Sequence, residues 1–234
     1  MTPEEFASFL EENREEGFRS FTVRILCTPL DVVGVRIPAL RNVAKIICRE
    51  DWKSFISQPT MNFEHCLVKA LVIATVNITG KERLALTKEF LQEIVDWAVC
   101  DTFCGAWKVT DDVRGELWGW CVNLLETGEE FPMRVGAVML MSKFIDDEHI
   151  GSILGLLTAK RESPGYYWDM GCAWALSFCY IAYPDRTEEA IFAGDLTPEV
   201  LRMAVYKVRD SYRVSGERKK ALKARYQKFR ARSS

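Results

Sequence analysis

The sequence predicts an all-α protein, and three observations lead to this fold class. Apolar segments are preceded by proline or by capping side chains, which is where α-helices begin. Gly80, Gly128 and Gly194 fall between these segments, where helix ends are expected. The period-two alternation of β-strands is missing along the chain.

The expected helices can be followed in order from their first residues. The opening stretch MTPEEFASFLEENREE has a Thr-Pro start and continues as an acidic amphipathic helix. Later starts are marked by Pro38, Asn62, Pro132, Ser163-Pro164 and Thr197-Pro198. Shorter amphipathic helices, such as ERLALTKEFLQEIVDW and DEHIGSILGLL, follow the strongly apolar ones.

The spacing of the apolar helices predicts their arrangement. They begin near Asn62, Asp101, Phe131, Tyr166 and Glu199. Successive starts are therefore about 30 to 40 residues apart, a period typical of HEAT or armadillo repeats. The expected architecture is a HEAT-like α-solenoid of stacked antiparallel helix pairs with a concave basic face, and the alternative is a compact helical bundle.

We expect a single helical-repeat domain over residues 1–234. Residues 1–33 are predicted to form an N-terminal helical cap, residues 34–214 the HEAT-like core, and residues 215–234 a basic C-terminal helix. The chain begins without the basic and apolar pattern of a signal peptide, so a cytoplasmic protein is expected. Its longest nearly apolar run, residues 170–183, is too short to cross a bilayer.

The charge of the chain is unevenly distributed. Residues 201–234 carry twelve basic and two acidic side chains, although the whole chain has a net charge of −2. Such a split suggests an anionic partner at the C-terminal end, nucleic acid being the commonest. The alternative is a solvated terminal helix that improves solubility.

The stretch IVDWAVCDTFCGAWK, residues 94–108, places two cysteines, an aspartate and two tryptophans within a few helical turns. Cys100 and Cys104 are four residues apart and share a helix face. The only histidines, His65 and His149, do not complete a zinc-binding pattern, so neither a metal nor a cofactor is expected. The eight cysteines of the chain are expected to be reduced, buried small hydrophobes.

Six short motifs together resemble the DNA alkylation repair family of AlkD-like, HEAT-repeat DNA glycosylases. They are GVRIPALR (34–41), VCDTFC (99–104), FPMRVGAVML (131–140), MGCAWALS (170–177), YPD (183–185) and KVRDSYRV (207–214). The resemblance implies a solenoid that binds duplex DNA and hydrolyses the N-glycosidic bond of cationic N3- or N7-alkylated purines. Because such a base leaves as a neutral molecule, the enzyme mainly has to stabilise an oxocarbenium-like sugar.

The resemblance also implies roles for individual residues. Arg134 stands where the family has an arginine that contacts DNA beside the lesion, and Trp174 where it has an aromatic that packs against the sugar. Cys104 replaces the catalytic aspartate and Cys100 its companion tryptophan, while a neighbouring aspartate is kept as Asp101. Asp101 is therefore the candidate catalytic carboxylate, and Trp97 or Trp107 the candidate replacement aromatic.

Basic residues of the last motif, Lys207, Arg209 and Arg213, are predicted to join Arg134 and Trp174 in binding DNA. Each predicted site residue also has a structural interpretation: Asp101 as a helix cap, Arg134 as a snorkelling side chain, Trp174 as a core aromatic. The predicted function is excision of alkylated purines from duplex DNA. Two alternatives remain, a non-catalytic module for duplex or branched DNA and a scaffold for a protein partner.

Overall fold

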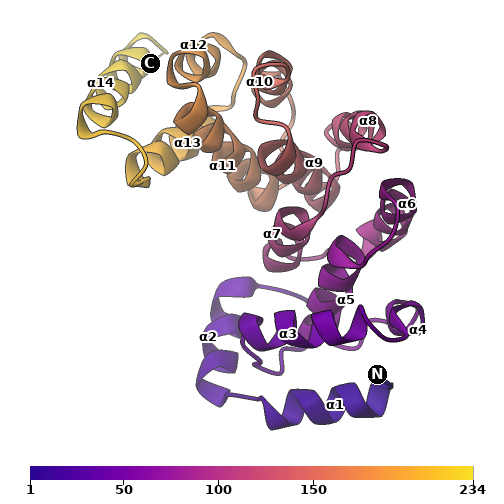
Figure 1. The fold of residues 1–234 in the computed structure, drawn as a ribbon. Helices are drawn as coiled ribbons and strands as arrows, with labels where there is room; N and C mark the ends of the chain where they lie inside the picture. Colours follow the sequence, from indigo (N-terminus) through magenta and orange to yellow (C-terminus); the bar gives the residue numbers. More distant parts are fainter. Residues whose placement is uncertain (234) are drawn as a thin grey trace. The chain divides into compact units, whose positions relative to one another are not determined.

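The fold is all-α, as the sequence predicts. The computed structural model describes residues 1–233, and within them every regular element is helical (Figure 1). The one strand-like feature in that range is an isolated antiparallel bridge between Arg14 and Val35. The chain divides into two compact units, unit 1 (Met1–Leu117) and unit 2 (from Trp118 onward).

Unit 1 holds seven α-helices, a single 3-10 turn and the first residues of α8. Its elements are α1 (Pro3–Glu12), α2 (Glu16–Leu26), α3 (Ile37–Ile47), α4 (Trp52–Ile56), α5 (Phe63–Thr75), α6 (Gly80–Phe90), η1 (Leu91–Glu93) and α7 (Trp97–Ala106). Helix α5 packs between α3 and α7, and α4 and α6 also lie against it. The core of the unit is therefore centred on α5, where nearly every side chain is buried.

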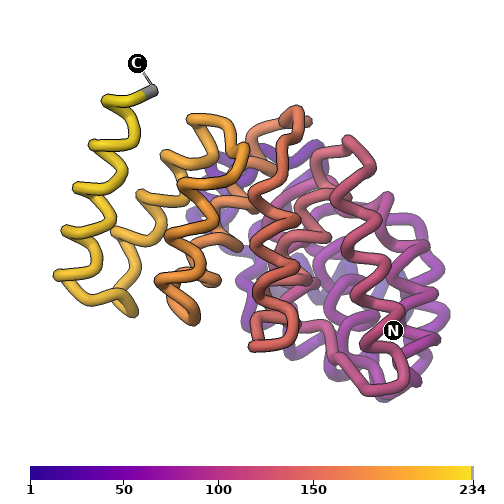
Figure 2. The backbone as a smooth tube through the Cα atoms, turned by 90° about the horizontal axis from the view of Figure 1, so that it is seen from above, coloured from indigo at the N-terminus to yellow at the C-terminus, as the bar shows by residue number. Residues whose placement is uncertain are grey.

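Unit 2 takes most of α8 (Arg114–Leu124) and the remaining helices. These are α9 (Glu130–Lys143), α10 (Ile150–Thr158), α11 (Tyr166–Ala182), α12 (Pro184–Ala193), α13 (Pro198–Asp210) and α14 (Gly216–Ser233). Helix α11 packs between α9 and α13, α12 lies against α11, and α14 lies against α13. Figure 2 shows α14, in yellow, at the end of this row. Such stacking of helix pairs is the arrangement of helical-repeat proteins.

Several predicted helix starts are confirmed, because each is held by a side-chain cap. Asn62 accepts a hydrogen bond from His65 N (2.8 Å) at the start of α5. Thr197 does the same for Val200 N (3.2 Å) before α13. Thr2 and Glu5 form a reciprocal capping box at α1.

The predicted start near Asp101 is wrong, as is the alternative that Asp101 caps a helix. Helix α7 begins at Trp97, and its cap is Asp96, whose carboxylate accepts a hydrogen bond from Val99 N (2.9 Å). The expected helix from residue 82 to 97 instead ends at Phe90, followed by the η1 turn. Asp101 therefore lies in the middle of α7.

The motif GVRIPALR begins in a loop that is fixed by a buried carboxylate. Glu64 is fully buried and accepts hydrogen bonds from the backbone N–H groups of Val33 (3.0 Å), Gly34 (2.7 Å) and Val35 (3.2 Å). Gly34 has a φ of 102°, and a Cβ there would lie 2.6 Å from Arg19 Cβ. This motif therefore positions the start of α3 and is structural.

We expect Glu64→Gln to lower the free energy of unfolding by about 2 kcal/mol, because the amide turns an N–H donor toward a backbone donor and removes the charge. Urea unfolding measures this change, with the exposed Glu89→Gln on α6 as the matched control. Equal stability of the two variants would mean that these three backbone bonds contribute little.

Candidate nucleic-acid interface

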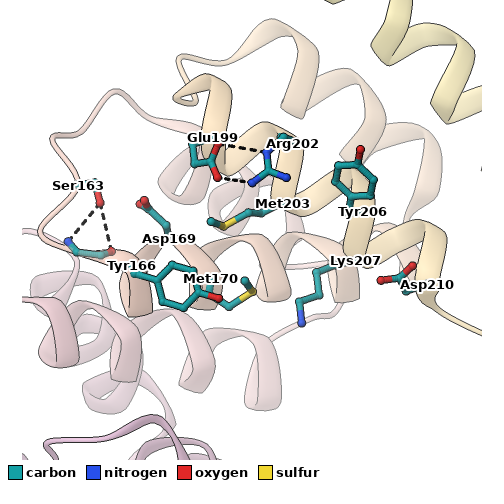
Figure 3. Close-up of a pocket in the computed structure, with 11 residues that line it drawn as sticks. Ser163, Tyr166, Asp169, Met170, Glu199, Arg202, Met203, Tyr206, Lys207 and Asp210 are labelled. Carbon is teal, nitrogen blue, oxygen red and sulfur yellow. Dashed lines mark hydrogen bonds and ion pairs between the residues drawn. The ribbon is translucent and has the colours of Figure 1, made fainter. Parts of the chain in front are cut away.

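An open cleft of about 530 Å³ lies between α11 and α13 in unit 2 (Figure 3). Met170 and Met203 give it an apolar lining, and Lys207 extends into it from α13. Tyr166 and Tyr206, which are 57% and 46% exposed, also line it. The cleft thus offers aromatic and apolar surface together with a cation.

Carboxylates also line the cleft. Glu199 accepts a hydrogen bond from Arg202 Nε (3.2 Å) on the same helix, and Asp210 lines the far end. Asp169 Oδ1 is buried and has no hydrogen-bond partner within residues 1–233. Burial raises the pKa of this carboxyl group. The cleft is therefore mixed in charge.

An aromatic strip continues along α11 beyond the cleft. Trp174 follows Met170 by one helical turn and is half-exposed. Its ring meets that of Phe178 edge-on, with centroids 5.6 Å apart. The exposed guanidinium of Arg213 lies over Phe178, with Cζ 4.4 Å from the ring centroid. The strip joins an accessible tryptophan to a cation held by an aromatic face.

Tyr206 separates the cleft from the next groove on α13. The guanidinium groups of Arg202 and Arg209 lie 5.7 and 5.3 Å from its ring centroid. These three residues share one face of the helix because they are spaced by four and three positions. Arg209 therefore faces away from Lys207 and toward α14, where it lines a second groove.

Arg134 is buried, with only 4% of its surface exposed. Its Nη1 donates a hydrogen bond to the backbone oxygen of Tyr167 (2.6 Å). Gly171 leaves room for its stem, since a Cβ there would lie 3.0 Å from Arg134 Cγ. On the same helix, Glu130 accepts a hydrogen bond from Tyr167 N (2.6 Å). Arg134 and Glu130, both on α9, thus hold the first turn of α11 through the backbone of Tyr167.

Helix α7 in unit 1 presents Asp101 and hides both cysteines. Cys100 and Cys104 are fully buried, whereas Asp101 is partly exposed. Asp96, one turn before Cys100, is buried, and its pKa is raised chiefly by burial and slightly by the charge of Asp101. Of these three residues, Asp101 is therefore the one that is exposed in part.

Residues 4–213 match the family model of DNA alkylation repair enzymes. The chain belongs to the DNA alkylation repair enzyme family. This membership supports a role in DNA repair, with DNA as the partner. No curated protein and no solved structure matches the chain. The matched residues end just before α14.

The predicted DNA-binding residues of this family member fall in different places. Trp174 and Arg213 belong to the aromatic strip, and Lys207 lines the neighbouring cleft. Arg209 lies on the other side of Tyr206. Arg134 is buried, and its Nη1 donates a hydrogen bond to the carbonyl of Tyr167.

Trp97 and Trp107, the candidates to replace the family's tryptophan, differ in their exposure. Trp107 is a core residue, 2% exposed, and its Nε1 donates a hydrogen bond to Thr87 Oγ1 (2.9 Å). Trp97 is half-exposed at the start of α7, and its Nε1 lies 3.5 Å from the backbone oxygen of Ile25. Of the two, Trp97 has the accessible ring.

Two surface aromatics were not predicted from the sequence. Phe178 connects Trp174 to Arg213, and its spacing of four residues from Trp174 is the signal that identifies it. Tyr206 is flanked by arginines at helical spacing, which is also visible in the sequence.

Six of the eight cysteines are buried as expected, whereas Cys27 is exposed and Cys48 is half-buried. Within residues 1–233, no three His, Cys, Asp or Glu side chains are grouped so that they could hold a metal ion. None of the helices in that range combines the length and the apolar character needed to span a membrane.

Proposed function

We propose that this protein binds duplex DNA through the aromatic strip and the adjacent Lys207. The observation that carries this proposal is the exposed Arg213 guanidinium held 4.4 Å from the Phe178 ring centroid, beside Trp174. A guanidinium held in place loses less freedom when it binds a phosphate, and Arg is well suited to that contact. Phosphate contacts of this kind position a duplex without reading its sequence.

Lys207 and Trp174 support the same proposal. Helices α11 and α13 run in the same direction, since Tyr166 and Glu199, near their first residues, both line the cleft, and Phe178 and Arg213 lie together beyond it. Lys207 and Arg213 thus project from α13 and the loop after it toward the exposed face of α11. The half-exposed indole of Trp174 is available to pack against a deoxyribose.

The chemical part of the proposal is excision of cationic N3- or N7-alkylated purines. The bond between C1′ and the purine nitrogen breaks, and its electron pair neutralises the departing base. Water then adds to C1′ and releases a proton. A negative charge near the sugar stabilises this transition state. We assign that role to Asp101, because it is the accessible carboxylate of the segment in which Cys104 is buried.

One observation favours a second candidate, a non-catalytic DNA-binding module. The position that resembles the family's catalytic aspartate holds Cys104, whose side chain is fully buried and carries no fixed charge. Such a module would bind distorted or branched duplex by shape and phosphate contacts.

Release of free base distinguishes the two candidates. Excess protein is incubated with a duplex that contains a single N7-methylguanine, and the freed base is quantified by mass spectrometry. We expect slow release, because Asp101 lies about one helical turn from the position of the family's carboxylate. Tight binding without any release would assign the protein to the non-catalytic class.

A further inference from the structure

A second groove, of about 370 Å³, lies between α13 and α14. Tyr206 and Arg209 line it from α13, and Lys223, Tyr226 and Arg230 line it from α14. No acidic side chain lines this α13/α14 groove within residues 1–233. Helix α14 lies outside the residues matched by the family model, so this groove is not assigned by family membership.

The docking of α14 determines which of its cations face the groove. Leu222 is fully buried, and Arg225 Nη1 pairs with Glu188 of α12 (3.1 Å). Arg218 pairs with Asp185, and the ring of Phe229 lies 5.4 Å from that of Phe192. Residues 218, 222, 225 and 229 therefore form the docking stripe of the helix.

The neighbouring stripe of α14 is turned toward the groove. Residues 223, 226 and 230 each follow a docking residue by one position, which rotates them by about 100°. The carboxylates of α12 thus pair with arginines of the docking stripe, while Lys223 and Arg230 line the groove wall.

On the opposite wall, Tyr206 is 46% exposed and Arg209 lies 5.3 Å from its ring centroid. The cleft on the other side of Tyr206 contains Asp169, Glu199 and Asp210. The absence of such carboxylates from the α13/α14 groove, within residues 1–233, makes it the more cationic of the two.

We propose that the α13/α14 groove binds single-stranded DNA. Arg209, Lys223 and Arg230 contact phosphates, and the rings of Tyr206 and Tyr226 stack on unpaired bases. A cationic groove with aromatic walls is the arrangement that binds single strands, because base faces are available for stacking only when the bases are unpaired. This goes beyond duplex binding by the aromatic strip and does not depend on base excision.

Anisotropy of a fluorescein-labelled oligothymidine, about 15 nucleotides long to exceed one site, tests the proposal with the full chain. We expect Tyr226→Leu to weaken binding about tenfold, the usual loss of one stacked base. Tyr226→Phe retains the ring, and we expect its affinity to stay within about twofold of wild type. Circular dichroism of each variant verifies that the helical content of the chain is unchanged.

Charge variants give an independent measurement. We expect Lys223→Gln to reduce the slope of log affinity against log salt by about 0.7, the value for one phosphate contact on a single strand. Lys220→Gln, an exposed change elsewhere on α14, is the matched control and should leave the slope nearly unchanged.

Equal effects of the two lysine variants, together with no effect of Tyr226→Leu, would overturn the proposal. If Tyr226→Leu and Lys223→Gln weaken binding to a blunt duplex as much as binding to oligothymidine, the proposal is also contradicted. The groove would then belong to the duplex surface. The proposed duplex binding is tested separately. If wild-type protein binds no duplex but still binds oligothymidine through the groove, the duplex proposal is wrong and the single-strand proposal stands.

Discussion

Replacing Asp101 by asparagine is expected to slow the release of N7-methylguanine about a hundredfold, because loss of one fixed electrostatic stabiliser typically costs that much in rate. Asparagine is nearly isosteric with aspartate, so DNA affinity should change far less than the rate. Single-turnover release with excess protein separates the two quantities.

Asp111→Asn is the matched control, since it removes a carboxylate from an exposed turn of the same unit. Its release rate should equal that of wild type. Unchanged release by Asp101→Asn would remove Asp101 from the chemistry, and an equal decrease in both variants would point to a general effect of net charge.

The second large effect concerns Cys104→Asp. By sequence resemblance this change restores the family's carboxylate, but the Cys104 side chain is fully buried. An uncompensated charge at a buried position typically costs about 3–5 kcal/mol. We therefore expect urea unfolding to show a loss of that size without a gain in base release.

Cys104→Ala is the control for this variant, because it removes the thiol without introducing a charge. It should cost about 1 kcal/mol, the usual effect of a small loss of buried volume. Faster release by a stable Cys104→Asp variant would show instead that position 104 reaches the substrate and that the cleft lacks only its charge.

The start of a helix was predictable where a capping side chain directly precedes an apolar run and the residues before it break the helical pattern. Asn62 and Thr197 precede apolar runs and cap α5 and α13 as expected. The break before α7 was not predictable, because residues 91–95 continue a helical pattern and contain neither proline nor glycine. In the structure, the hydrogen bond that the Asp96 carboxylate accepts from Val99 N marks the true start.

The candidate site was predictable in part. Trp174 was predicted from the resemblance, and it is accessible in the structure. The burial of Arg134 was not predictable, because it depends on space left by Gly171, which is 37 positions away in sequence. The grooves that Lys207 and Arg209 line were likewise not predictable, because they depend on the packing of α13 between α11 and α14.

Salt dependence of duplex binding tests the DNA interface of unit 2 most directly. We expect wild-type affinity for a blunt duplex to fall steeply with salt, and Arg213→Gln and Lys207→Gln each to reduce the log-log slope by about 0.9, the value for one phosphate contact. Lys160→Gln, an exposed change on another loop of unit 2, should leave the slope unchanged. A wild-type slope near zero, or identical slopes for all three variants and wild type, would contradict the proposed interface.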